Sequence, residues 1–502
     1  MRKKDRKPHI KQKQFADRNY SSLESHTRRK GGLDSPFKKI TGATFSSWYS
    51  TYLPNVLWAC VLSSLLDREL YLSLFRQTVM AARELEEGSR PRVIAHSFLG
   101  EVSDEIFDRI FGAVLSTPTA REVLRSLCLI EALPDRRHWL RNLGEPNQET
   151  DWSPLVHAVA DNFDHQSQRA TDVRWMKVMH EIISGQTRFS EQMADLLENF
   201  RLYPNRGEMS RVRPHIRAME MGLRNIEAGL LGEEAPSMMG EAFWVEMKQK
   251  TSCIHPREFE PPTLPSAALR DEAMSVMERL QNHFDETVVT TNVDARHDGA
   301  FGLTLFSMSY LVSLSAFYGH DFPFSRTVLR SIVESFITLE YLAKKDDPSI
   351  WEQYRRYGAG QAKLVFLKNI REEEVPEFFD LRLMEALANE DMWMEFEDVE
   401  IGNWAKTDLR SMAIFAGVKR EYDLYYDWAS GFAHGHWMAV RETAFVNCLN
   451  PLHRYHRIPG PPLSPLPSVL PDAAKLVNRM LDRLNHLYPT FTPRLSAHRT
   501  QK

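Results

Sequence analysis

Hydrophobic residues recur with a helical period along most of the chain. One clear window carries a single apolar stripe at Ile106, Phe107, Ile110, Phe111, Val114 and Leu115. Thr119 and Glu122 then form a capping-box pattern, which predicts that the next helix begins there. Further helical windows lie near residues 173–184, 190–202, 211–231 and 237–249, and we find neither convincing alternating strands nor a fixed-period repeat. The pattern predicts an all-α protein.

Proline-rich stretches divide this helical pattern. Pro256, Pro261, Pro262 and Pro265 fall close together and cannot continue a helix. We therefore predict two helical-bundle regions, residues 46–254 and 270–450, joined by a Pro-rich linker at residues 255–269. A second Pro-rich linker, residues 451–471, precedes a terminal amphipathic helix at residues 472–490 and a tail at residues 491–502. That helix is expected to dock on either bundle.

The first 45 residues differ from the rest in charge. Residues 1–30 hold eleven Lys or Arg against three acidic residues, whereas the whole chain has a formal charge of −4. This composition predicts a basic, disordered N-terminal arm. The arm could attract RNA or another polyanion, or it could be only a solvated tail.

Composition and cysteine spacing limit the class of protein. With 502 residues, 43% of them hydrophobic and 26% charged, the chain resembles globular proteins with more than one domain. Cys60, Cys128, Cys253 and Cys448 lie far apart in sequence, so they indicate neither a disulfide framework nor a thiolate zinc site. We expect a cytoplasmic protein without cofactor or metal, and no signal-peptide pattern follows Met1.

One uncharged stretch, residues 299–319, has about the length of a membrane span. Thr304, Ser307, Ser309 and Ser313 dilute its hydrophobicity, and no second stretch of this kind is present. We therefore expect a buried core helix and no membrane association.

Two rows of polar side chains in the C-terminal region, here called polar stripes, are the candidate catalytic or binding residues. On the helix predicted over residues 321–340, the positions i, i+4 and i+8 carry Arg326, Arg330 and Glu334. On the helix predicted over residues 421–441, the same spacing places Tyr426, Ser430 and His434 on one face. Phosphate-loop, dinucleotide-binding, His-Glu-x-x-His and Gly-x-Ser-x-Gly motifs are not found.

These stripes support two different hypotheses. In the first, His434 is the base and Arg330 the phosphate clamp of a metal-independent ribonuclease, with Glu334 beside them and Tyr426 and Ser430 as orienting groups. In the second, the same side chains form a hydrogen-bonded network that fixes helix packing. His436 would point away from His434 on a helix, so a metal chelate is not favoured.

Arg330 and Glu334, together with Tyr426, Ser430 and His434, resemble a bacterial family of unknown function numbered 5677. The resemblance covers roughly residues 270–450, and Trp351, Tyr354 and Tyr357 fit the aromatic middle helix of the family. It implies an all-helical bundle with no established activity. Such bundles are also similar to higher-eukaryote-and-prokaryote nucleotide-binding (HEPN-like) helical domains, which implies a ribonuclease or nucleotide-binding effector in phage defence.

The sequence departs from the nuclease pattern near His434. That pattern has an arginine separated from the histidine by four to six intervening residues, and Asp427 stands where the arginine before His434 would be. Arg330 or Arg326 would have to supply the guanidinium from another helix. We therefore favour a non-catalytic interaction or scaffold protein, with a protein partner or self-association, and keep the HEPN-like ribonuclease as the alternative. Arg326, Tyr357, Tyr426 and Ser430 are the candidate binding residues.

Overall fold

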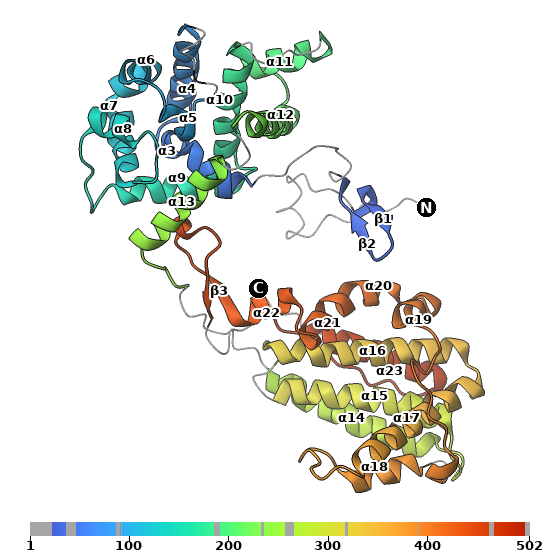
Figure 1. Cartoon of the computed structure of the whole chain (residues 1–502). Coiled ribbons are helices and arrows are strands. Elements are labelled where there is room, and N and C mark those ends of the chain that lie inside the picture. The colour runs from blue at the N-terminus through green and yellow to red at the C-terminus, as the bar shows by residue number, and fades with distance from the viewer. Residues whose placement is uncertain are drawn as a thin grey trace. The chain divides into compact units, whose positions relative to one another are not determined.

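The computed structural model describes residues 23–36, 47–86, 91, 93–184, 191–231, 235–256, 266–316, 320–390, 392–460 and 466–496. Regular structure in these ranges is almost entirely helical, which confirms the predicted all-α class. Two short strand pairs accompany the helices: β1 (Thr27–Arg29) with β2 (Gly32–Asp34), and β3 (Phe445–Asn447) with β4 (Arg457–Pro459). The contacts divide the chain into two compact units (Figure 1). Unit 1 comprises residues 1–256 and 447–456, and unit 2 comprises residues 257–446 and 457–502.

Unit 1 is built from helices packed around an apolar core that includes Trp58, Phe75, Trp139 and Trp175. Its elements are η3 (Trp48–Tyr52), α2 (Leu53–Asn55), α3 (Leu57–Leu65), α4 (Arg68–Arg83), α5 (His96–Leu99), α6 (Asp104–Ser116), α7 (Pro118–Leu124), η5 (Arg125–Leu129), α8 (Arg136–Leu143), α9 (Trp152–Phe163), α10 (Gln168–Ser184), η6 (Glu191–Met193), α11 (Ala194–Arg201), α12 (Met209–Leu231), α13 (Ala235–Lys250) and η9 (Pro451–His453). Helix α10 packs against α3, α4 and α12, and α3 also packs against α9.

The starts of α6 and α7 show how local sequence sets these elements. Ser103 caps α6, because its Oγ accepts a hydrogen bond from the Ile106 amide at 3.3 Å. The predicted capping box at Thr119 is wrong: α7 begins at Pro118, after Thr117 as N-cap, and no side-chain cap forms. Proline suits the first helical position because its fixed φ matches the helix and its missing N–H would have had no partner there.

Unit 2 is a second helical bundle with its own core. Its elements are α14 (Ser266–Thr287), α15 (Ala295–Ala316), α16 (Pro323–Lys345), α17 (Pro348–Asn369), α18 (Leu381–Ala388), η7 (Met394–Phe396), α19 (Leu409–Ala416), α20 (Lys419–Glu421), η8 (Tyr422–Tyr426), α21 (Asp427–Ala433), α22 (Trp437–Ala444) and α23 (Leu470–Leu487). The expected terminal helix is α23, and it packs against α15 and α16 of unit 2.

Helix α15 contains most of the uncharged stretch. Among the described residues it is the one helix long and apolar enough to cross a membrane by length and composition. Half of its most apolar window is buried in unit 2, where the helix packs against α14, α16, α17 and α23. Phe301, Met308 and Leu311 are fully covered.

Two segments differ from the predicted organisation. Part of the expected disordered arm, residues 23–36, forms a 3-10 turn, η1 (Leu23–Ser25), and the β1–β2 hairpin. Gly31 allows the tight turn with a φ of 79°, and Arg29 Nε lies 2.9 Å from Asp34 Oδ1. The stretch predicted as a linker at residues 451–471 begins with η9, whose Leu452 is buried in the core of unit 1. Residues 257–265 and 461–465 of the two predicted linkers lie outside the described residues.

Candidate functional site

Arg330 is the centre of the candidate site in unit 2. It lies on α16, one turn before Glu334, and its Nε donates a hydrogen bond to Glu334 Oε1 at 2.9 Å. Its Nη2 donates to the hydroxyl of Tyr426 at 3.1 Å, and its Nη1 lies 3.0 Å from His434 Nε2. All three guanidinium nitrogens therefore contact side chains of the two predicted polar stripes.

The segment opposite α16 is not the continuous helix predicted over residues 421–441. It runs through η8, a stretch of π-helix, into α21 and stops at His434. Gly435 has a φ of 60°, and the amide of His436 donates back to the carbonyl of Gly431 at 2.9 Å. This is a Schellman ending, which satisfies a carbonyl that the helix end leaves without a partner. Gly435 was the signal in the sequence that marks this stop.

The surroundings keep Arg330 charged and partly accessible. Its side chain is 19% exposed, and that of Glu334 is 38% exposed. Burial alone would lower the pKa of Arg330, but the Glu334 carboxylate and the Tyr426 hydroxyl outweigh it, so the pKa is raised. The guanidinium also lies 5.2 Å from the centre of the Tyr426 ring, which stacks on Tyr422 at 4.8 Å.

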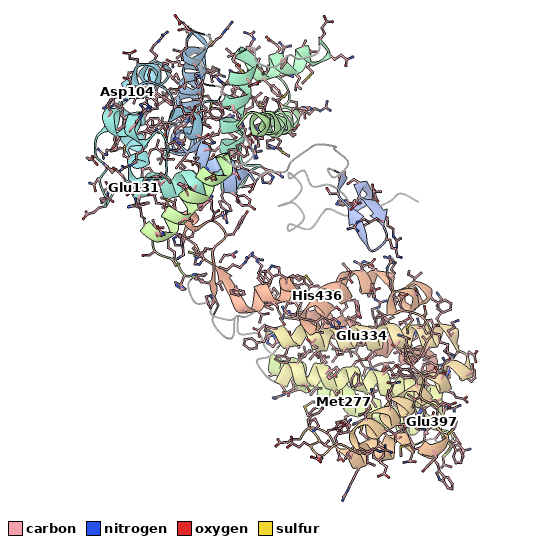
Figure 2. The ribbon with its side chains drawn as sticks, viewed as in Figure 1. Asp104, Glu131, Met277, Glu334, Glu397 and His436 are labelled. Atoms are coloured by element: carbon pink, nitrogen blue, oxygen red, sulfur yellow. The ribbon has the colours of Figure 1, made fainter. Side chains whose placement is uncertain are left out.

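His434 occupies an exposed position at the end of α21. An arginine can only donate hydrogen bonds, so in this contact Nε2 of His434 is the acceptor. The exposed His436 ring lies 5.9 Å from the His434 ring. Figure 2 labels His436 and Glu334 within unit 2.

The other predicted residues lie apart from this contact. Arg326 is buried, and its guanidinium donates to the carbonyl groups of Phe322 and Pro467; burial lowers its pKa to about 10. Tyr357 donates to the carbonyl of Gly402 at 2.7 Å. Ser430 is half-buried, and its backbone carbonyl accepts from the amide of His434 at 3.1 Å. Neither Arg326 nor Tyr357 contacts His434.

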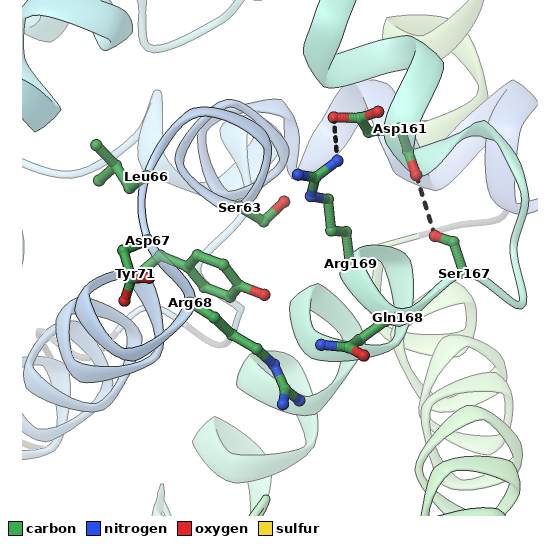
Figure 3. A pocket seen from close by; sticks show the side chains of 9 residues that line it. All are labelled: Ser63, Leu66, Asp67, Arg68, Tyr71, Asp161, Ser167, Gln168 and Arg169. Carbon is green, nitrogen blue, oxygen red and sulfur yellow. Dashed lines mark hydrogen bonds and ion pairs between the residues drawn. The ribbon is translucent and has the colours of Figure 1, made fainter.

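Unit 1 contains a cavity of about 520 Å³ that sequence reasoning did not indicate. Figure 3 shows its lining from α3, α4, α9, α10 and the connecting loops: Ser63, Leu66, Asp67, Arg68, Tyr71, Asp161, Ser167, Gln168 and Arg169. Arg169 pairs with Asp161, and Arg68 pairs with the buried Asp172 at 2.9 Å. These nine residues include no histidine or cysteine, and ion pairs dominate their charged contacts.

A second set of side chains in unit 1 could hold a metal ion. Cys253, Cys448, His453 and His456 each offer one ligand atom, and these four atoms lie within 4.8 Å of one another. The cysteine spacing in the sequence did not indicate this cluster, which contains both Cys253 and Cys448. These two cysteines are distant in sequence but close in space, because residues 447–456 belong to unit 1 although residues 257–446, which precede them, belong to unit 2.

Part of unit 2 is similar to a known protein family. Residues 318–450 match a family of unknown function, DUF5677. The matched segment is shorter than the resemblance over residues 270–450 suggested, but it contains Arg330, Glu334, Tyr426 and His434. No curated protein and no solved structure matches the chain.

Proposed function

We propose that unit 2 is a non-catalytic interaction module in which Arg330 fixes the packing of α16 against η8 and α21. The observation that carries this proposal is that Glu334, Tyr426 and His434 engage every nitrogen of the guanidinium. These contacts use three of the five N–H donors, so a phosphate group that engaged the whole guanidinium would have to displace some of them, at a cost of roughly 0.5–3 kcal/mol each. A guanidinium with these three contacts is suited to holding the helices together rather than to catalysis.

Exposed apolar side chains near this network support an interaction role. Leu424, Trp428 and Trp437 are 54%, 48% and 58% exposed, and they lie on η8, α21 and α22. Exposed tryptophans and large apolar side chains are enriched on surfaces that contact another protein. A protein partner, including a second copy of the chain, fits this surface.

The test compares variants of the network with variants of the surface. Arg330→Ala should lower the melting temperature of unit 2, whereas a Trp428→Ser, Trp437→Ser double variant should keep it and lose partners. Light scattering measures self-association, and cross-linking in cells followed by mass spectrometry measures other partners. If the folded double variant, present at the wild-type level, keeps every partner, the interaction role is excluded.

A metal-independent, HEPN-like ribonuclease is the second candidate, supported by the contact between Arg330 and His434. Once Arg330 turns from His434 to the phosphate, the freed Nε2 lone pair can take the 2′-hydroxyl proton while the 2′-oxygen attacks phosphorus and the P–O5′ bond breaks, with the 5′-oxygen taking a proton from water. Arg330 would stabilise the charge on the phosphate. The products would be a 2′,3′-cyclic phosphate and a 5′-hydroxyl end.

RNA incubated with the purified chain distinguishes the two candidates. The ribonuclease hypothesis requires His434→Ala to reduce cleavage by about 10²–10⁴-fold while His436→Ala, the matched exposed neighbour, retains it. Cleavage that is equal in both variants excludes His434 as the base. Binding of RNA through the basic arm is tested separately, because deletion of residues 1–30 should remove a strongly salt-dependent affinity.

A further inference from the structure

We propose that Cys253, Cys448, His453 and His456 form a structural zinc site in unit 1. The site has no part in the proposed function of unit 2. It is a set of two sulfur and two nitrogen ligands, which in tetrahedral arrangement is typical of Zn²⁺.

The spacing of the ligand atoms fits a tetrahedral ion. Cys448 Sγ lies 3.4 Å from His453 Nδ1, and Cys253 Sγ lies 3.6 Å from His456 Nδ1. With a Zn–S distance of about 2.3 Å and a Zn–N distance of about 2.0 Å, the sulfur–nitrogen edge of a tetrahedron is about 3.5 Å. All four ligand atoms lie within 4.8 Å of one another, so only small movements would complete the coordination.

The surrounding groups orient His453 for a metal on Nδ1. Its Nε2 lies 3.1 Å from the carbonyl oxygen of Thr251 and 2.9 Å from the Thr251 hydroxyl. A proton on Nε2, donated to that carbonyl, leaves the lone pair of Nδ1 directed at the site. A histidine that binds zinc usually donates its other ring N–H to an oxygen in this way.

Hydrogen-bond donors also surround the two sulfur atoms, as thiolates require. The backbone amides of Ile254 and Asn450 lie 3.3 Å and 3.5 Å from Cys448 Sγ. The ammonium group of Lys248 lies 3.4 Å from Cys253 Sγ. Donors of this kind stabilise negative charge on sulfur, which is the form that binds metal.

The loop that carries three of the ligands is held independently of any ion. Asn450 is buried, and its side-chain amide donates to the carbonyl of Ser252 at 2.8 Å. Leu452 is fully buried in the core of unit 1, and the ring of Tyr455 packs against Tyr49 at 4.5 Å. The four ligands are therefore brought together before binding, and zinc would join residues 251–254 to residues 447–456.

Metal analysis of the full chain, purified with reduced thiols and equilibrated with Zn²⁺, tests the proposal. We expect one zinc per chain, and replacement by Co²⁺ should give the absorption of a tetrahedral, thiolate-bound ion. Cys448→Ser and His453→Ala should lose the metal, whereas Cys60→Ala and Cys128→Ala should retain it, because those buried cysteines lie elsewhere in unit 1.

The wild-type measurement keeps the proposal falsifiable even if a ligand variant does not fold. Substoichiometric zinc in folded, reduced wild-type chain would overturn it, and so would a thiolate-free cobalt spectrum. A disulfide between Cys253 and Cys448 in protein isolated under reducing conditions would also exclude the site.

Discussion

Replacing Glu220 with glutamine should strongly destabilise unit 1. Glu220 is 1% exposed, and its carboxylate lies within 3.4 Å of Arg174, Lys177 and Arg224 side chains. The closest contact is the two-pronged pair with Arg224, at 2.5 Å and 2.6 Å. The variant would leave three buried cations around a neutral amide. Loss of one partner from a buried ion pair costs about 3–5 kcal/mol.

The pKa of Glu220 gives a second measure of this contribution. Burial alone would raise it, but the three cations outweigh burial and lower it from 4.5 to about 2. A folded-state pKa below the unfolded value means that the stabilisation is complete above the unfolded pKa and is lost as the pH falls through the folded pKa. The lowered pKa has the sign of a group whose ionised form stabilises the folded state at neutral pH.

Denaturant unfolding of wild type and Glu220→Gln at several pH values measures this effect. We expect a difference of about 3 kcal/mol near neutral pH, equivalent to roughly 6–12 °C in melting temperature for a unit of this size, and a smaller difference at about pH 3. Glu198→Gln, which removes an exposed pair with Arg201, is the control and should change little. Equal stability of wild type and Glu220→Gln near neutral pH would refute the reasoning.

Three further predictions concern packing, the Arg330 network and the zinc site. Gly240→Ala should lower the melting temperature of unit 1, because the added Cβ would lie 2.6 Å from the backbone oxygen of Ser50. Gly222→Ala has open space around it and should stabilise its helix by about 0.5–1 kcal/mol, so thermal unfolding of the two variants gives opposite shifts. Arg330→Lys should lower the melting temperature nearly as much as Arg330→Ala, because an ammonium group cannot contact Glu334, Tyr426 and His434 at the same time. Asn450→Ala should weaken zinc affinity in chelator competition, because its side chain joins the two ligand-bearing segments through Ser252.

The spacing of apolar residues predicted the helices well, because the buried face of a helix requires apolar side chains every three or four positions. The stripe at Phe107, Ile110, Phe111 and Val114 is buried in α6. The helix over residues 421–441 failed at one point, since Gly435 takes a left-handed conformation that ends α21. A single glycine is a weak signal beside many apolar residues, so the pattern extended the helix too far.

Contacts between distant segments could not be predicted in the same way. Arg330 and Glu334 could be placed on one face from their spacing, but the contact of Arg330 with His434 depends on how α16 packs against α21. Arg326 shares the stripe of Arg330, yet it lies against backbone carbonyls. Position on a helix therefore identifies a face, whereas the tertiary packing decides which side chain on that face reaches a partner.

The division of the chain has a direct consequence for work on unit 1 alone. A fragment that ends at residue 256 would lack Leu452, which is fully buried in the core of unit 1, and three of the four proposed zinc ligands. It would also lose the contact between Asn450 and Ser252. Removal of a fully buried leucine side chain by itself costs about 2–5 kcal/mol. Unit 1 should therefore fold stably only when residues 447–456 are supplied, either in the full chain or through a designed connection to residue 256.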